Sequence, residues 1–205
     1  MNLAFFILIS CALIGGIEFV KRKFSLSTNV TRRVTHVGAA LIAAISPLFL
    51  NQLTIVITCL FFAGLVFVGR KTTFLSSIHD VERKSFGDIF LPLGEALSAI
   101  VFLPHSVAAF QFGVLVMGIS DALAGLIGEK YGKHKIRFVG STKSVEGSAV
   151  FFICTLILTL FFAPVFSYQL IIIPAILTIV EFLAIYGLDN LVLPILGAFL
   201  IQFLI

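Results

Sequence analysis

All 14 Lys and Arg residues of this chain fall within three short stretches, 21–33, 70–84 and 130–143. The residues between these stretches are almost entirely apolar. Only 12% of the 205 residues are charged, about half of the share that an ordinary soluble domain carries. The mean hydropathy is +1.16. A chain of this composition must place much of its surface in lipid, so the sequence predicts an integral membrane protein.

Apolar segments of about 20 residues are long enough to cross a membrane as helices. They predict an all-α fold, a polytopic membrane helix bundle of about eight transmembrane helices that forms a single domain over residues 1–205. The predicted spans lie near residues 2–20, 34–50, 52–69, 86–104, 107–128, 147–166, 168–187 and 189–205.

The three basic stretches follow the first, third and fifth predicted spans, so they should emerge on one face of the membrane. The short connections after the second, fourth and sixth spans contain no Lys or Arg. Basic residues favour the cytoplasmic side. We therefore expect a multi-pass protein of a prokaryotic cytoplasmic membrane, with both termini outside. The same rule accounts for the net charge of +4 without a nucleic-acid partner, and no motif points to a protein partner.

Five carboxylates lie inside the predicted spans, where an ionisable group is costly and usually functional: Glu18, Asp88, Glu95, Asp121 and Glu181. All lie in the cytoplasmic halves of their helices, so we expect them to face one cleft beside the basic rim. A structural alternative is that a neighbouring Arg or Lys neutralises each of them. Carboxylates together with substrate phosphates suit Mg²⁺, and basic side chains neutralise the remaining phosphate oxygens. The pattern predicts phosphoryl or nucleotidyl transfer with Mg²⁺ or Mn²⁺.

The third basic stretch ends in small and hydroxyl residues that lead into a predicted span. It reads Gly140-Ser141-Thr142-Lys143-Ser144-Val145-Glu146-Gly147-Ser148. A helix N-terminus attracts anions, and glycine lets the backbone approach a phosphate closely. The spacing is not that of a Walker A loop. The segment predicts a phosphate-binding loop, with a plain helix cap as the alternative.

Five blocks of the chain, in order, resemble the dolichol kinase, phytol kinase and CTP-dependent diacylglycerol kinase family of membrane lipid kinases, the polyprenol kinase family. The blocks are residues 32–38, 82–94, 118–132, 143–148 and 180–194. The third departs from the family's adjacent Gly-Asp pair, because Ile119 and Ser120 separate Gly118 from Asp121.

The resemblance implies transfer of a phosphoryl group from a nucleoside triphosphate to a membrane lipid alcohol. The donor would be CTP as cosubstrate, and the acceptor dolichol or another polyprenol, a phytol-like alcohol or diacylglycerol. The active site would lie on the cytoplasmic face.

The resemblance also implies catalytic roles for Asp121, Lys143 and Glu146, and metal binding by Asp121, Glu181 and Asp189. The implied nucleotide-binding residues are Arg32, Arg33, His36, Gly125, Gly128, Gly140, Ser144, Gly147 and Asn190. Which carboxylate acts as base stays open, and His36 could equally begin a helix.

Two other functions fit parts of the pattern. A cytidylyltransferase that forms a CDP-lipid would use the same residue types but attack the α-phosphate. Its marker is missing here, namely a Lys-Asp run followed by paired glycines and two close aspartates near the carboxyl end. A small ion-coupled transporter would also bury carboxylates. Transporter sites, however, favour the bilayer midplane and paired repeats, and this chain contains no evident repeat.

Overall fold

The structure is a computed structural model that describes residues 3–70, 85–138, 141–163 and 168–204. Helices dominate the described residues, and one short β-hairpin interrupts them. The elements in order are α1 (Leu3–Phe24), α2 (Thr28–Ile45), the 3-10 turn η1 (Ser46–Leu48), α3 (Gln52–Gly69), α4 (Gly87–Phe102), α5 (Val107–Leu115), the π-helical turn η3 (Val116–Ser120), α6 (Asp121–Tyr131), β1 (Lys135–Phe138), β2 (Ser141–Ser144), α7 (Val145–Phe162), α8 (Gln169–Leu183) and α9 (Asp189–Leu204).

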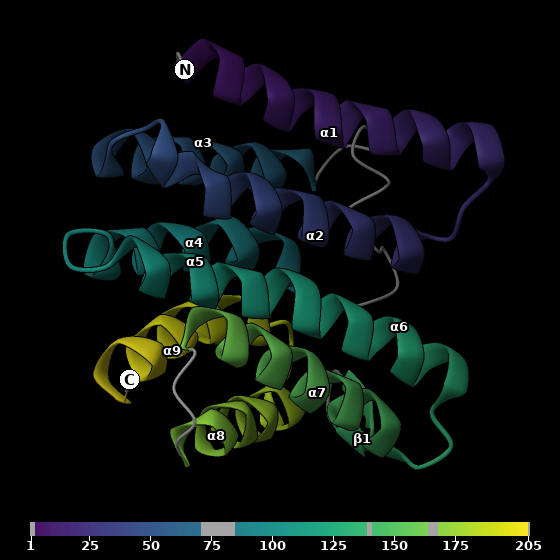
Figure 1. Cartoon of the computed structure of the whole chain (residues 1–205). Helices are drawn as coiled ribbons and strands as arrows, with labels where there is room; N and C mark the ends of the chain where they lie inside the picture. Colours follow the sequence, from purple (N-terminus) through teal and green to yellow (C-terminus); the bar gives the residue numbers. More distant parts are fainter. Residues whose placement is uncertain (1–2, 71–84, 139–140, 164–167, 205) are drawn as a thin grey trace.

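The helices run roughly along one direction and form a bundle, with α1 at one edge and α8 at the other (Figure 1). Helix α9 packs against α4, α5 and α8, while α7 packs against α6 and α8. Phe112, Phe151 and Leu193 are fully buried in the core between these helices. A second apolar cluster around Ile55 and Phe110 joins α3 and α4 to α2 and α5.

The bundle has the features of a membrane protein. Among the described residues, Gln52–Gly69, Val107–Tyr131 and Val145–Phe162 are long and apolar enough to cross a bilayer, and α8 and α9 are shorter apolar helices. Large apolar side chains such as Phe161 (82% exposed) lie on its surface, which suits contact with lipid. The predicted helical class is confirmed, and every predicted span contains a helix. The count of about eight crossings stays a prediction.

The described parts of the first and third basic stretches lie at the same end of the bundle. These are the connection from α1 to α2 and the segment between α6 and α7, and both chain ends lie at the opposite end (Figure 1). Arg70 ends α3, and residues 71–84 of the second stretch lie outside the described residues. This arrangement agrees with the predicted common face. Which side of the membrane that face occupies remains a prediction.

The hairpin β1–β2 was not predicted. Lys135–Phe138 pairs antiparallel with Ser141–Ser144, so that Ile136 lies opposite Lys143. The Phe138 ring packs edge-to-face against Phe182 of α8, with ring centroids 5.4 Å apart. That contact fixes the hairpin on α8. Lys143 therefore lies on a strand, where the sequence predicted a phosphate-binding loop.

The fifth predicted span contains the π-helical turn η3, directly before Asp121. A π-turn adds residues to a helix and often lies at a functional site. Ile119 and Ser120, the two residues by which the chain departs from the family pattern, both belong to this turn. Gly118 lies against α2, since a Cβ atom there would come within 2.0 Å of the Ala40 Cβ. The turn thus packs closely against α2 immediately before Asp121.

Candidate active site

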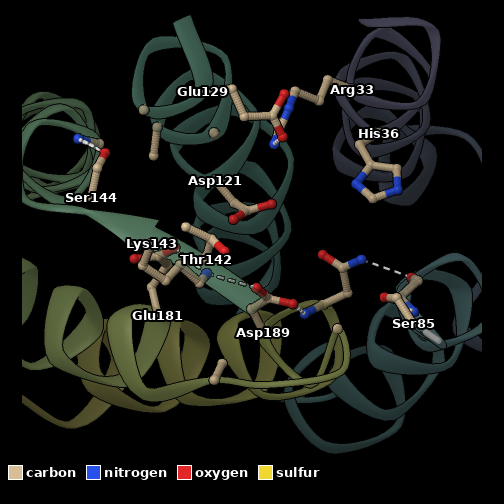
Figure 2. A pocket seen from close by; sticks show the side chains of 18 of the residues that line it. Arg33, His36, Ser85, Asp121, Glu129, Thr142, Lys143, Ser144, Glu181 and Asp189 are labelled. Atoms are coloured by element: carbon tan, nitrogen blue, oxygen red, sulfur yellow. Dashed lines mark hydrogen bonds and ion pairs between the residues drawn. The ribbon is translucent and has the colours of Figure 1, made fainter. Parts of the chain in front are cut away.

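A polar cavity of about 250 Å³ lies at the hairpin end of the bundle. Helices α2, α4, α6, α7, α8 and α9 and the hairpin all contribute side chains to it (Figure 2). Its lining comprises Arg32, Arg33, His36, Ser85, Gly87, Asp88, Asp121, Ala124, Gly125, Gly128, Glu129, Lys135, Thr142, Lys143, Ser144, Gly147, Ser148, Glu181, Ala184, Gly187, Asp189 and Asn190.

Three carboxylates meet inside this cavity and form what we call the carboxylate cluster: Asp121, Glu181 and Asp189. One oxygen from each lies within 4.8 Å of the others. Asp121 begins α6, Glu181 lies near the end of α8, and Asp189 begins α9. Segments 60 residues apart in the chain therefore converge on one point, as a shared ligand would require.

A tight turn between α8 and α9 brings Glu181 and Asp189 together. Gly187 in that turn has a φ of +86°, a conformation that side chains with a Cβ rarely adopt. A Cβ at Gly187 would also approach the Cα of Gly87 to 2.5 Å. Two glycines thus let α4 contact the turn that positions the cluster.

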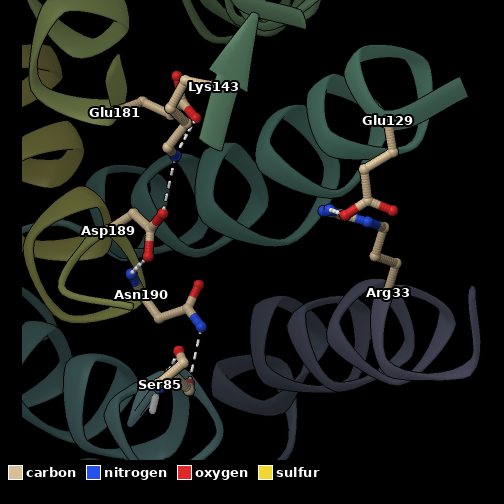
Figure 3. Close-up of polar contacts among 8 residues, drawn as sticks. Arg33, Ser85, Glu129, Lys143, Glu181, Asp189 and Asn190 are labelled. Atoms are coloured by element: carbon tan, nitrogen blue, oxygen red, sulfur yellow. Dashed lines mark hydrogen bonds and ion pairs between the residues drawn. The ribbon is translucent and has the colours of Figure 1, made fainter. Parts of the chain in front are cut away.

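Lys143 is the cation within the carboxylate cluster. Its Nζ donates to Oδ2 of Asp189 at 3.1 Å and to Oε1 of Glu181 (Figure 3). Burial lowers the pKa of Lys143, but attraction to Asp189, Glu181 and Asp121 outweighs burial and raises that pKa above its usual value. Lys143 is therefore charged at neutral pH. One ammonium faces three carboxylates, so the cluster has an excess of acidic groups.

The cluster suits a divalent metal ion. Its donor atoms are carboxylate oxygens, which Mg²⁺ and Mn²⁺ prefer. Oε2 of Glu181 and Oδ1 of the adjacent Asn190 are buried without a hydrogen-bond partner among the described residues. Buried polar atoms normally have a partner. A bound cation would provide charge balance for the three carboxylates, so the residues present fit the metal that the sequence predicts.

The opposite wall carries the basic rim. Arg33 is buried, and its Nη2 donates to Oε1 of Glu129 at 2.6 Å (Figure 3). Gly125 makes room for this arginine, because a Cβ at that position would lie 1.8 Å from Nη1 of Arg33. Arg32 and Lys135 also line the cavity. Guanidinium and ammonium groups at this wall could contact phosphate oxygens.

The N-terminus of α7 forms another part of the wall. Ser144 caps this helix, since its Oγ accepts a hydrogen bond from the backbone N–H of Gly147 at 3.0 Å. A Cβ on Gly147 would come within 2.8 Å of the Ala124 carbonyl oxygen. Small residues thus let α6 and α7 approach closely. The cap that the sequence offered as an alternative is present, and it lies on the cavity.

The structure brings together all of the predicted site residues except two. Glu146 does not line the cavity and instead pairs with His134, with 2.8 Å between Oε1 and Nδ1. Gly140 lies outside the described residues. The remaining predicted residues all line the cavity. Their chemical roles stay predictions.

The expectation that all in-span carboxylates share one cleft was too broad. Asp88, Asp121 and Glu181 line the polar cavity. Glu18 instead pairs with Arg22 one turn further along α1, at 2.8 Å, because that end of α1 reaches the basic face. Glu95 lines a separate apolar cavity.

Several lining residues were given no role by the sequence. Asp88 carried a signal as an acid inside a span, and it accepts a hydrogen bond from Nε of Arg70 at 3.0 Å. Glu129 and Lys135 carried none, because charged residues beyond the end of a span resemble ordinary solvated ones. Only the folding of the hairpin places Lys135 on the cavity.

Fold and cavity together define a class: a helical membrane protein with a polar cavity, lined by carboxylates and basic side chains, at one end of its bundle. The chain is 29% identical over 193 residues to a phytol kinase from Synechocystis sp., an alignment that covers 90% of this chain and 82% of that protein. It is 36% identical over 118 residues to an uncharacterised protein from Methanocaldococcus jannaschii, covering 57% and 58% of the two chains. No family model and no solved structure matches the chain.

The similarity to the phytol kinase spans nearly the whole chain. It supports placing this protein in the polyprenol and phytol kinase family, as the five sequence blocks predicted.

Proposed function

We propose that this protein is a membrane lipid kinase that transfers the terminal phosphoryl group of a nucleoside triphosphate, CTP, to a lipid alcohol. The observation that carries the proposal is the carboxylate cluster with Lys143, facing Arg33 across one cavity at the basic end of the bundle. Similarity to a phytol kinase supports the same reaction class.

Each group in the cavity has a place in this reaction. Asp121, Glu181 and Asp189 would hold Mg²⁺ or Mn²⁺. When bound, that ion would supply positive charge to the phosphate oxygens. Lys143 would exchange part of its contact with the carboxylates for a contact with the transferring group. The remaining phosphates would be bound by the planar guanidinium groups of Arg32 and Arg33 and by the ammonium group of Lys135.

The proposed phosphoryl transfer forms one bond to phosphorus and breaks another. The alcohol oxygen bonds to the γ-phosphorus while the bond from that phosphorus to the β–γ bridging oxygen breaks. The nucleoside diphosphate leaves with the electron pair, and the hydroxyl proton passes to an acceptor side chain of the cavity. Such transfers depend chiefly on position and on charge stabilisation. The charged and hydrogen-bonding side chains that line the cavity are suited to both.

The donor is tested by assaying purified protein with CTP, ATP, GTP and UTP in turn, with a panel of lipid alcohols. The expected products are a lipid monophosphate and CDP, identified by mass spectrometry. A parallel assay supplies a lipid monophosphate as acceptor, and release of pyrophosphate with formation of a CDP-lipid there would replace the kinase with a cytidylyltransferase. CTP as the preferred donor rests on the family resemblance, so equal turnover with ATP would overturn the donor and leave the kinase standing.

We also propose that the polar cavity faces the cytoplasm, where nucleoside triphosphates are available. The basic residues at that end support this orientation. In a background without Cys11, Cys59 and Cys154, single cysteines at Asn51 and His105 should react with a membrane-impermeant maleimide on intact cells. Labelling of both only after permeabilisation would invert the topology.

A further inference from the structure

A second cavity lies deeper in the bundle and touches the first. It has a volume of about 90 Å³ and is enclosed by α1, α2, α3 and α4. Phe6, Leu13, Ile55, Phe62 and Leu91 are among the apolar side chains that line it. His36 and Asp88 line both cavities. The two cavities are therefore adjacent, and these two residues, which we call the junction, form part of the wall of each.

The hydroxyl side chains in the wall of this apolar cavity are already satisfied. Thr35 donates to the Thr31 carbonyl at 2.9 Å, and Thr58 donates to the Thr54 carbonyl at 2.8 Å. Ser46 is bound to the Ala43 carbonyl at 2.7 Å. Side chains that donate to their own helix have no donor left for a ligand. The wall therefore presents mainly hydrocarbon to whatever fills the cavity.

Two buried polar atoms of this wall lack a hydrogen-bond partner among the described residues, Nε2 of His36 and Oε1 of Glu95. His36 is at the junction and points from α2 toward the polar cavity (Figure 2). Glu95 lies seven residues beyond Asp88 on α4, about 10 Å deeper at 1.5 Å per residue. A hydroxyl bound at Glu95 would be far from the carboxylate cluster, whereas a hydroxyl at His36 faces it.

We propose that the apolar cavity binds the hydrocarbon chain of the acceptor next to its hydroxyl, and that His36 receives a hydrogen bond from that hydroxyl at the junction. The inference rests on the proposed kinase activity and specifies its acceptor site. The occupant is a lipid alcohol with one reacting hydroxyl and an apolar chain. Its chain approaches from the α1 side, and its hydroxyl meets the phosphate donor from the opposite direction.

The placement of α1 is consistent with entry from the membrane. This helix supplies Phe6, Leu13 and Ile14 to the cavity wall, yet its main packing partner is α2 alone. A helix at the edge of a bundle with one main neighbour can separate from α3 and α4 more easily than a central helix. A lipid chain could then enter between them without crossing the core.

The first test measures binding without transfer. A long-chain alcohol with a diazirine near its hydroxyl is photolysed with purified full-length protein in lipid nanodiscs, without nucleotide. Labels should map to residues of α1 to α4 around Ala39. Phytol should compete, and the matching hydrocarbon without a hydroxyl should compete poorly. Labels confined to the outer lipid-facing surface would overturn the proposal.

The second test narrows the cavity. Ala39 lines it, so Ala39→Phe should raise KM for the alcohol by about tenfold while leaving KM for the nucleotide near its wild-type value. Ala108→Phe is the matched control, because Ala108 is exposed on α5 and lines neither cavity. An unchanged nucleotide KM shows that Ala39→Phe has folded. Equal behaviour of the two variants would overturn the proposal.

Two further variants test the polar atoms. His36→Leu should raise KM for the alcohol, and His36→Gln should recover part of the loss because its amide can still accept a hydrogen bond. Glu95→Leu should keep acceptor binding. Loss of that binding in Glu95→Leu would mean that the occupant carries a second polar group, which contradicts a plain hydrocarbon chain.

The outcomes separate this inference from the proposed function. If wild-type protein phosphorylates an alcohol but the labels lie elsewhere, the acceptor cavity is wrong and the kinase stands. If no alcohol is phosphorylated while the labels still map to α1–α4, the kinase is wrong and the lipid cavity stands.

Discussion

The two walls of the polar cavity differ in how their charged side chains are paired. On the wall formed by α2 and α6, Arg33 meets one carboxylate, Glu129, in a one-to-one pair. On the wall formed by the hairpin, α8 and α9, Lys143 contacts two carboxylates while Asp121 lies close to both. On the first wall the buried arginine is thus balanced by one carboxylate. The second is left with an acidic excess.

This difference indicates which wall needs a ligand. Two like charges 4 Å apart repel by about 4 kcal/mol at an effective dielectric constant of about 20. Three carboxylate oxygens lie within 4.8 Å of one another, and Lys143 alone cannot neutralise all three when they are ionised. A balanced pair explains itself structurally, whereas the unbalanced cluster is what we expect of a site that binds a metal ion.

Removing one carboxylate from the unbalanced wall should have the largest effect. Asp121→Asn should lower turnover by more than about 10³-fold, beyond the 10²–10³ typical for one electrostatic contact, because both the metal site and its charge change. The melting temperature should stay the same or rise, since like-charge repulsion is relieved. Turnover by mass spectrometry and Mn²⁺ binding by electron paramagnetic resonance measure the two effects.

Glu18→Gln is the control for this substitution. It also removes a carboxylate from an apolar helix, but Glu18 pairs with Arg22 outside the cavity. Its turnover should stay close to wild type. Near-normal turnover in Asp121→Asn would show that the cluster is structural.

Carboxylates inside apolar segments made much of this site predictable. Asp121 and Glu181 stand out in the sequence because placing an ionisable carboxyl group inside a membrane span is energetically costly in any fold. Glu129 and Glu146 could not be told apart in that way, since both lie in a polar connection. Only the folded structure separates them: Glu146 pairs with His134, next to the hairpin, whereas Glu129 pairs with Arg33 on the cavity.

The hairpin itself had only a faint signal. Lys135-Ile136-Arg137-Phe138 alternates polar and apolar residues, but four residues are the minimum for a strand pattern. Its stability depends on the contact between Phe138 and Phe182, two residues far apart in the chain. The helical segments were predictable because each one is set by its own hydropathy.

Removing the cation of the unbalanced wall should have the next largest effect. Lys143→Ala should lower turnover by about 10²–10³, and Lys143→Arg should recover part, because a guanidinium is larger and differently directed. Mn²⁺ should bind Lys143→Ala at least as tightly as wild type, since the acidic excess grows. If the basic residues acted only through their summed charge, Lys143→Ala would lower turnover weakly and to the same extent as Lys21→Ala. Lys21 serves as control because it bonds to Thr28 outside the cavity.

The smallest effect should come from disturbing the balanced wall. Gly125→Ala places a methyl group where the Arg33 guanidinium now lies, 1.8 Å from Nη1. A long side chain can move away without unfolding the helix, so the melting temperature should change little. KM for the nucleotide should rise by about tenfold, equal to about 1.4 kcal/mol, because Arg33 loses its position facing the phosphates. Gly64→Ala on α3 is the matched control, since a Cβ there meets nothing within 4 Å. If Gly125→Ala lowers turnover as strongly as Lys143→Ala does, the two walls do not differ in kind, and Arg33 belongs to the transferring site itself.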